Sequence, residues 1–341
     1  MIRDAAALLE QLRAIHAAIR DAVLAACERS AIEQLSTAVA EEGGDTIYAI
    51  DRVSEEVLVH HFTRLAERWS CVLVAEGLGP TGELVLPSGT RDEDAELRII
   101  VDPIDGTRGL MYQKRSAWVL TGVAPNHGAA TTLADVELAL QTEIPLLKQH
   151  LADSLWVLAG VVGGERLNRL DAAWTALVPR PSRARTVAQG FGGLARFFPG
   201  ARDLLAAVDD AVVARLLGPP QAGRALAFED QYISTGGQLY ELLMGHDRWI
   251  ADLRPLAERV LARRGHALGL CCHPYDLCTE AIARAAGVVV TDARGARLAA
   301  PLDVTTDMSW IGYANAELAA SVGPVLRAVL REHGMDPDEA P

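Results

Sequence analysis

The sequence LRIIVDPIDGT spans Leu97–Thr107. Its run Ile99–Val101 is short, apolar and β-branched, which predicts a buried strand. A tight turn follows this strand. Pro103 restricts its own φ and favours extended geometry at Asp102, while Gly106 permits a bend that other residues resist. We therefore expect the side chains of this turn to project together from the end of the strand.

Four oxygen donors of the turn can point at one small volume. They are the Asp102 and Asp105 carboxylates, the Ile104 carbonyl and the Thr107 hydroxyl. Carboxylate and carbonyl oxygens are hard ligands, which suits Mg²⁺. The alternative interpretation is an ordinary acidic β-turn, in which Asp and Gly serve the turn geometry. Two aspartates alone would favour that alternative, whereas the whole hexapeptide after a buried strand favours a metal site.

Composition limits the partners of the chain. It has 341 residues, 50% of them hydrophobic, enough for one large or two medium domains. The formal net charge of −13 argues against nucleic acid or an anionic membrane as a partner, since both require clustered Lys and Arg. A phosphorylated substrate is still compatible, because bound metal ions can invert the local field.

The cysteine pattern and the apolar runs indicate the compartment. Five unevenly spaced cysteines form neither a disulfide framework nor a zinc pattern, so we expect reduced thiols in a cytoplasmic protein. The first twenty residues carry charges among alanines and leucines and do not resemble a signal peptide. No uncharged apolar run approaches the roughly 20 residues of a membrane helix.

Periodicity predicts a mixture of helices and strands that do not alternate strictly, so we expect an α/β (α+β) layered fold with mixed sheets. Helices are predicted over 4–29, 51–67, 204–217, 277–286 and 316–332, with a further helix around 240–244. Strands are predicted over 71–74, 99–101, 116–124, 136–140, 155–162, 249–252, 288–291 and 311–314, with loops at 41–45 and 79–95. The Pro- and Arg-rich stretch 171–185 suggests a domain boundary. Residues 1–180 would carry most metal ligands, and residues 181–341 would complete the site.

Further acids lie at the ends of other predicted elements. Glu76 follows the strand at 71–74, and Asp51 and Asp276 each precede a helix. Hydrolysis of a phosphate ester by two metal ions needs several carboxylates from separate elements. Helix capping is the alternative for Asp51 or Asp276 alone. The joint pattern favours a shared metal site.

The hexapeptide DPIDGT resembles the D-P-[IL]-D-G-T signature of the inositol monophosphatase family. That family belongs to a superfamily with fructose-1,6-bisphosphatases and 3'-phosphoadenosine phosphatases. The resemblance implies a two-domain αβαβα sandwich and a Mg²⁺-dependent phosphomonoesterase. Its substrate would be a small phosphorylated metabolite: an inositol monophosphate, a sugar phosphate or a 3'-phosphonucleotide. Two or three Mg²⁺ ions, inhibition by Li⁺ and a homodimer are further implications.

The resemblance also assigns roles residue by residue. The implied metal ligands are Glu76, Asp102, the Ile104 carbonyl, Asp105 and Asp276. Thr107, with Asp51 or Glu76, would orient and deprotonate the attacking water. The implied substrate-binding residues are Gly106, Thr107, Arg108, Asp252 and Asp276.

Departures from the family pattern affect substrate identity more than metal binding. Gly77 stands where the family has a second Glu, and 253–270 resembles an insertion. Arg108, Lys114 and Arg115 either meet a second anionic part of the substrate or are surface charges. An alternative function is therefore a catalytically weakened regulatory protein that binds metal or ligand on the same scaffold. A chance occurrence of DPIDGT in an unrelated acidic domain is the remaining alternative.

Overall fold

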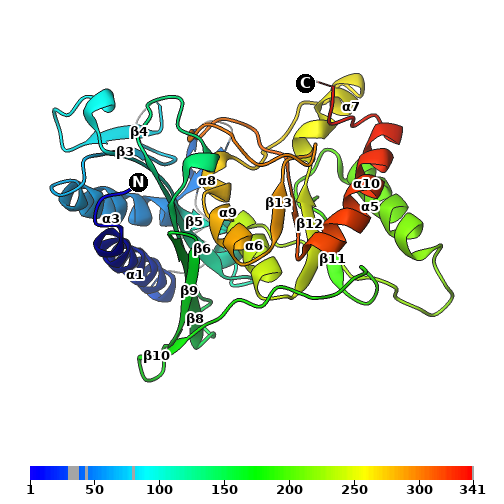
Figure 1. The fold of residues 1–341 in the computed structure, drawn as a ribbon, viewed down its shortest axis with the longest axis horizontal. Helices are drawn as coiled ribbons and strands as arrows, with labels where there is room; N and C mark the ends of the chain where they lie inside the picture. Colours follow the sequence, from blue (N-terminus) through cyan, green and yellow to red (C-terminus); the bar gives the residue numbers. More distant parts are fainter. Residues whose placement is uncertain (30–37, 43–44, 79–80, 340–341) are drawn as a thin grey trace.

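The computed structural model describes residues 1–29, 38–42, 45–78 and 81–339. Its strands form a two-stranded ribbon, an eight-stranded sheet and a four-stranded sheet. The ribbon pairs β1 (Ala38–Glu42) with β2 (Asp45–Tyr48). The two larger sheets stand apart with helices between them and on their outer faces (Figure 1).

The eight-stranded sheet has the order β10-β9-β8-β7-β6-β5-β3-β4. Its strands are β3 (Cys71–Val74), β4 (Glu83–Leu86), β5 (Leu97–Asp105), β6 (Ala117–Pro125), β7 (Leu138–Ile144), β8 (Leu151–Leu158), β9 (Val161–Asn168) and β10 (Ala173–Ala176). All neighbours are antiparallel except β3 and β5, which run parallel. This one parallel pair brings the ends of two strands to the same edge of the sheet.

The four-stranded sheet has the order β11-β12-β14-β13. Its strands are β11 (Phe191–Leu194), β12 (Asp247–Asp252), β13 (Val289–Thr291) and β14 (Trp310–Tyr313). The strand β11 is parallel to β12, and the other neighbours are antiparallel.

The helices complete a five-layer αβαβα sandwich, as the resemblance implied. The outer layer on the large sheet is α1 (Ala5–Arg29) and α3 (Ala49–Leu65), and the middle layer is α6 (Thr235–Leu243), α8 (Pro274–Leu277) and α9 (Glu280–Ala285). The far layer on the small sheet is α5 (Arg202–Leu217) and α10 (Ala316–Glu332). Short segments are α4 (Thr107–Met111), α7 (Glu258–Arg263) and the 3₁₀ turns η1 (Asp92–Asp94), η2 (Leu133–Asp135) and η3 (Arg254–Ala257).

Alternation along the central strands explains why helices cover both faces. Successive side chains of a strand point to opposite faces. Leu73 and Ile99 pack in the core beneath α1 and α3, whereas Val74 and Ile100 belong to the core shared with α6 and α9. A strand with helices on both faces must be apolar at every position, as β3 and the Ile99–Val101 run of β5 are.

Two predictions about elements are wrong, and a third can be compared only in part. The segment 79–95 was expected to be a loop, but it contains the edge strand β4, paired with β3. The segment 155–162 was expected to be one strand, but it is two, because β8 turns into β9 at Ala159 and Gly160. The turn expected at 41–45 has strand residues at 41, 42 and 45, while Gly43 and Gly44 lie outside the described residues.

The middle layer joins the two halves of the sequence. The large sheet ends with β10 and the small sheet begins with β11, yet α6 and α9 from the second half pack on the large sheet. A domain division near residue 180 stays a prediction. Among the described helices, none is both long and apolar enough to cross a bilayer.

Candidate active site

The parallel pair β3–β5 places two acids at one edge of the large sheet. Val74 at the end of β3 is in register with Ile100 of β5. Glu76 and Asp102 each lie two residues further along, so the two acids lie side by side where the parallel pairing ends. Both line a cavity of about 120 Å³. Sequence alone indicated strand ends but could not show that these strands are neighbours.

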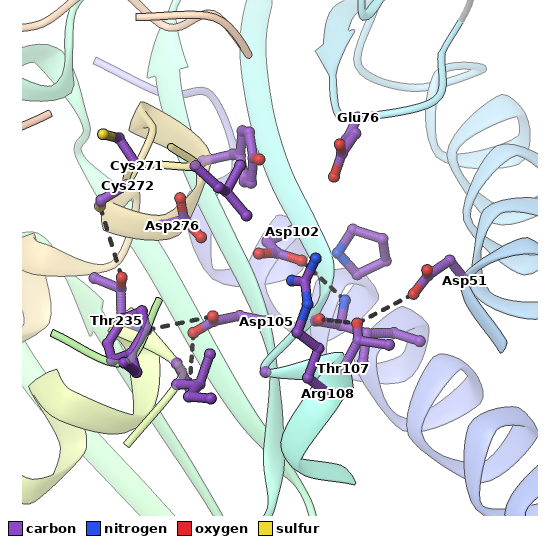
Figure 2. A pocket seen from close by; sticks show the side chains of 18 of the residues that line it. Asp51, Glu76, Asp102, Asp105, Thr107, Arg108, Thr235, Cys271, Cys272 and Asp276 are labelled. Carbon is purple, nitrogen blue, oxygen red and sulfur yellow. Dashed lines mark hydrogen bonds between the residues drawn. The ribbon is translucent and has the colours of Figure 1, made fainter. Parts of the chain in front are cut away.

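A bulge in β5 separates Asp102 from Asp105. Asp102 pairs with Leu120 of β6 and Asp105 pairs with Trp118, so β5 has one residue more than its partner strand between these positions. A bulge bends the strand and redirects its side chains. As a result, both carboxylates face the same cavity (Figure 2).

The N-terminus of α6 holds Asp105 in place. One Asp105 oxygen, Oδ2, accepts hydrogen bonds from the Ser234 hydroxyl (2.8 Å) and the Gly236 amide (2.6 Å). The Thr235 amide lies 3.3 Å from the other oxygen, Oδ1. Ser234 is also the N-cap of the helix. Helix N-termini favour negative charge, so α6 stabilises an ionised Asp105.

Asp276 reaches the same cavity from α8. Its Oδ2 accepts a hydrogen bond of 2.7 Å from the His273 amide, as part of a capping box. Asp276 therefore caps a helix and lines the cavity at the same time, so the two interpretations of this residue are compatible. The helix cap fixes the carboxylate where it faces Asp102 and Asp105.

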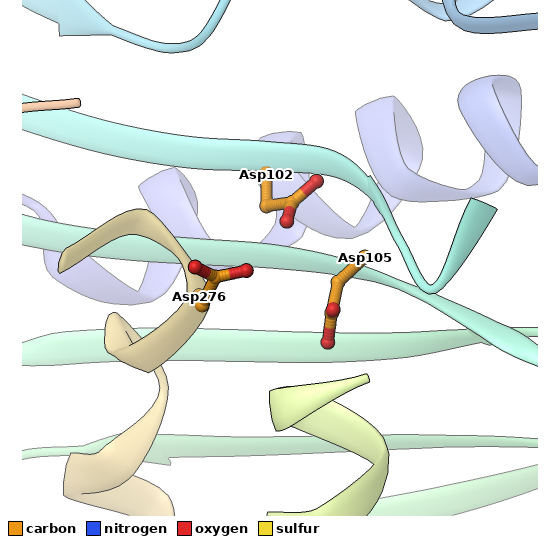
Figure 3. Close-up of side chains that lie close together, drawn as sticks. All are labelled: Asp102, Asp105 and Asp276. Atoms are coloured by element: carbon orange, nitrogen blue, oxygen red, sulfur yellow. The ribbon is translucent and has the colours of Figure 1, made fainter. Parts of the chain in front are cut away.

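The three aspartates form one cluster. Each of Asp102, Asp105 and Asp276 offers an oxygen, and these oxygens lie within 4.8 Å of one another (Figure 3). Burial, followed by the charges of Asp105, Asp276 and Glu76, raises the pKa of Asp102 well above its usual value. Burial and the charge of Asp105 likewise raise the pKa of Asp276. For Asp105, burial raises the pKa to about 6, although its hydrogen bonds oppose the shift.

This donor set fits a divalent cation. Buried carboxylates this close repel each other when ionised, and a cation between them removes that repulsion. Oxygen-only ligands suit Mg²⁺. Glu76 is outside the 4.8 Å cluster but lines the same cavity, and its carboxylate is directed toward Asp102 in Figure 2. The Ile104 carbonyl is engaged by a neighbouring hydroxyl and keeps a second lone pair for a ligand.

That hydroxyl belongs to Thr107. Its Oγ1 lies 2.8 Å from the Ile104 carbonyl and 3.1 Å from Asp51 Oδ1. Asp51 comes from the first turn of α3, a long way off in sequence. Gly106, just before Thr107, has φ of 96°, a left-handed conformation that Gly adopts readily. Gly106, Thr107 and Arg108 all line the cavity.

Asp252 lies outside the cavity wall. It is completely buried and is not among the residues that line the cavity. Its carboxylate accepts hydrogen bonds from the Arg254 guanidinium, and Arg254 does line the cavity. A direct role of Asp252 in substrate binding stays a prediction, and what the structure shows is that Asp252 holds the side chain of Arg254.

Lys114 and Arg115 are likewise absent from the cavity wall. Arg115 forms ion pairs with Asp230 and Glu241 and lies over the Tyr232 ring. Of the three basic residues after the turn, only Arg108 lines the cavity.

Glu55 is a cavity residue that the sequence analysis did not single out. It lies on α3, one helical turn after Asp51, so the two side chains share a face of the helix. That spacing was the sequence signal that could have indicated Glu55. A Cβ built at Gly77 would come within 2.7 Å of Glu55 Oε1. The Glu55 carboxylate therefore occupies the space beside Gly77, the position at which the family pattern has its second Glu.

The sequence itself has no recognisable relatives in two comparisons. No protein-family model matches it. No curated protein matches it either.

Solved structures, in contrast, match over nearly the whole chain. Fructose-1,6-bisphosphatase from Leishmania major has a TM-score of 0.66 at 13% identity, covering 95% of this chain and 93% of its own. Extragenic suppressor protein suhB from Bartonella henselae has a TM-score of 0.60 at 12% identity, covering 94% and 98%. An IMPase from Thermotoga maritima has a TM-score of 0.59 at 15% identity, covering 95% and 100%. The chain thus has the fold of the inositol monophosphatase and fructose-1,6-bisphosphatase superfamily.

Proposed function

We propose that this protein is a Mg²⁺-dependent phosphomonoesterase for a small phosphorylated metabolite. The observation that supports the proposal best is the cluster of Asp102, Asp105 and Asp276 beside the Thr107–Asp51 hydrogen bond. A metal-binding group and a group that can orient water thus line one cavity. The structural neighbours described as phosphatases add support at the level of the fold.

Each residue has a defined part in this proposal. Asp102, Asp105, Asp276, Glu76 and the Ile104 carbonyl would hold the metal ions. When bound, such ions activate water and stabilise the leaving alkoxide.

When the Thr107 hydroxyl donates its hydrogen bond to Asp51 Oδ1, the lone pairs of Oγ1 can accept a hydrogen bond from the attacking water. As the water attacks, its proton would pass to Oγ1 while the hydroxyl proton passes to the Asp51 carboxylate. Glu76 is the other carboxylate in reach of this role. The amides of Gly106 and Thr107 would hold the phosphate that is cleaved, and Arg108 would meet another anionic part of the substrate. No serine, cysteine or histidine nucleophile is part of the proposal.

Replacement of Asp105 by Asn tests the function. We expect phosphate release with Mg²⁺ to fall by at least about 100-fold, because a cluster ligand loses its charge. The substrates would be inositol 1-phosphate, fructose 1,6-bisphosphate and adenosine 3',5'-bisphosphate. Asp203→Asn is the matched control, since Asp203 is an exposed acid paired with Arg264.

Three measurements together separate the alternative functions: phosphate release, Mg²⁺ binding and the melting temperature. Mg²⁺ binding by calorimetry without phosphate release from any substrate would indicate a regulatory protein on this scaffold. Unchanged turnover in Asp105→Asn would contradict the metal assignment. An absence of any Mg²⁺-dependent change in melting temperature would contradict both.

Finer points remain proposals. All five cysteines are unpaired and buried, which supports a reducing compartment such as the cytoplasm. Two or three ions, Li⁺ inhibition and a homodimer are carried over from the family resemblance. The division into residues 1–180 and 181–341 is proposed from the change of sheet between β10 and β11.

A further inference from the structure

Arg254 is a buried arginine in the wall of the cavity. It lies in η3, at the start of the segment that resembles an insertion, and its residue is only 8% exposed. Nε and Nη2 donate to the Asp252 carboxylate, at 2.8 Å to Oδ1 and 2.5 Å to Oδ2. Nη1 donates to the Leu270 carbonyl at 2.5 Å. The guanidinium is therefore held by one residue just before the 253–270 segment, Asp252, and by its last residue, Leu270.

These bonds do not use the whole guanidinium. An arginine has five N–H groups, and one each on Nε, Nη1 and Nη2 has a partner among the described residues. One N–H on Nη1 and one on Nη2 remain for something else. Two donors in a fixed geometry at a cavity wall suit a planar or tetrahedral oxyanion.

Two phenylalanines form the surface on which this arginine lies. The Arg254 Cζ is 4.6 Å from the ring centroid of Phe197 and 5.1 Å from that of Phe198. Arg108, from α4, has its Cζ 5.3 Å from the centroid of the same Phe198 ring. Stacking on an aromatic face keeps a guanidinium in one plane. Phe198 thus brings two cationic side chains from separate halves of the chain to one wall.

This wall is built from different elements than the strand that carries Asp102 and Asp105. Phe197 and Phe198 lie between β11 and α5, and Leu270 lies just before α8. Asp102 and Asp105, in contrast, come from β5. Both regions line the same cavity.

We propose that Arg254 recognises a second anionic group of the substrate, at a subsite formed with Phe198 and Arg108. The substrate would then carry, besides the phosphoester that is cleaved, another phosphate or a carboxylate. Asp252 is a positioning residue, since it contacts Arg254 and not the cavity. This inference rests on the proposed function and narrows its substrate class to dianionic metabolites.

Matched substrate pairs test the proposal. Each pair differs by one anionic group: fructose 1,6-bisphosphate and fructose 1-phosphate, adenosine 3',5'-bisphosphate and adenosine 3'-phosphate, inositol 1,4-bisphosphate and inositol 1-phosphate. In at least one pair, we expect kcat/KM to favour the bisphosphate by roughly 10- to 100-fold, the range for hydrogen bonds to a charged group.

Arg254→Gln should remove that preference. The loss should fall on the bisphosphate, while the monophosphate changes by less than about threefold, because only one of them reaches the subsite. Arg264→Gln is the control: Arg264 is an exposed arginine that pairs with Asp203, near the same segment. Loss of Arg254 leaves a buried, unpaired Asp252, so Asp252→Asn/Arg254→Gln is the second variant if the single one does not fold.

The outcomes separate this inference from the proposed function. Equal rates within every pair, or an equal loss on both members in Arg254→Gln, would overturn the subsite. If no phosphate is released from any substrate, the proposed function fails. The subsite can then still be tested, by measuring the binding affinities of the same pairs by calorimetry. Tighter binding of the bisphosphates that disappears in Arg254→Gln supports the subsite, and equal affinities overturn it.

Discussion

The hydroxyl of Thr107 lies 3.1 Å from the carboxylate of Asp51, although 56 residues separate them in sequence. The contact joins the turn after β5 to the first turn of α3. Because Thr107 Oγ1 has a single proton, its bonds to Asp51 and to the Ile104 carbonyl compete. Whichever oxygen accepts that proton determines where the remaining lone pairs of Oγ1 point.

Asp51→Asn should therefore reduce turnover more than substrate binding. The Asn oxygen can still accept the Thr107 hydrogen bond, but an amide is not a base, so the proton of the attacking water loses its final acceptor. We expect kcat to fall by about 100-fold with little change in KM. Thr107→Val should show a similar loss, and the double variant should lose no more than the worse of the two. Additive losses would contradict a shared role.

Asp102→Asn should stabilise the metal-free protein and abolish its response to Mg²⁺. The Ile104 amide, 3.0 Å from Asp102 Oδ1, can donate equally well to an Asn oxygen, so the turn is preserved. Removing one of the repelling buried charges should raise the melting temperature by roughly 2–4 °C, or about 1 kcal/mol.

Scanning calorimetry with and without Mg²⁺ checks this prediction. The native protein should gain about 2.7 kcal/mol when Mg²⁺ is at 100 times its dissociation constant. The Asp102→Asn variant should gain much less, while Asp203→Asn should behave like the native protein. A lower melting temperature for metal-free Asp102→Asn would mean that the carboxylate has a stabilising partner instead.

Local sequence signals predicted much of the fold. The strand at β5 and the helices α1 and α10 follow from runs and periods that require no knowledge of the partner element. The error at β8 and β9 has a local cause. Their turn places Ala159 and Gly160 at φ of 50° and 76°, and Ala is an unusual residue for such a conformation. Gly160 was the single turn signal in the apolar run 155–162, and one Gly within such a run does not by itself separate two strands.

Site residues were predictable only where a motif or a strand end carried them. Asp102, Asp105 and Asp276 fell in such positions, and the structure brings them together. Arg254 could not be found in this way, because its role depends on where Asp252 and Leu270 hold it. Such contacts arise from tertiary packing rather than from local pattern.

Glu55→Gln should weaken metal-dependent activity. The Glu55 carboxylate lies in the cavity wall beside Gly77. It occupies the space that a Glu side chain at position 77 would need, and from there it can act on water or on the metal site. We expect a loss of about 10- to 100-fold in activity or in Mg²⁺ affinity, the usual range for residues that support metal ligands. Measuring the rate of phosphate release at increasing Mg²⁺ concentrations gives both the maximal activity and the apparent Mg²⁺ affinity.

A reciprocal variant provides the control for Glu55. Gly77→Glu should not restore activity, because Gly77 has φ of 79° and its new Cβ would meet the residue at position 55. Glu56→Gln, on the exposed side of α3, should leave activity unchanged. Native activity in Glu55→Gln would show that this carboxylate is only a neighbour of the site.

His16 should make the protein less stable in mild acid. Its ring is buried between the Thr121 and Thr142 hydroxyls, at 2.7 and 3.0 Å. Burial, with the charge of Arg20, lowers the pKa of His16 from 6.5 to about 3. The unfolded chain therefore binds a proton below pH 6.5 that the folded protein does not, so stability falls as the pH falls from 6.5 toward 3.

His16→Gln isolates this contribution, because its amide can still bond both threonines but does not titrate. Between pH 6 and pH 4, the unfolding free energy of the native protein should fall more steeply than that of the variant, by about 1.4 kcal/mol per pH unit. Urea denaturation at several pH values measures the two slopes. His266→Gln, at an exposed position, should keep the native slope. Parallel slopes for the native protein and His16→Gln would mean that the buried ring takes up its proton in the folded state as readily as in the unfolded one.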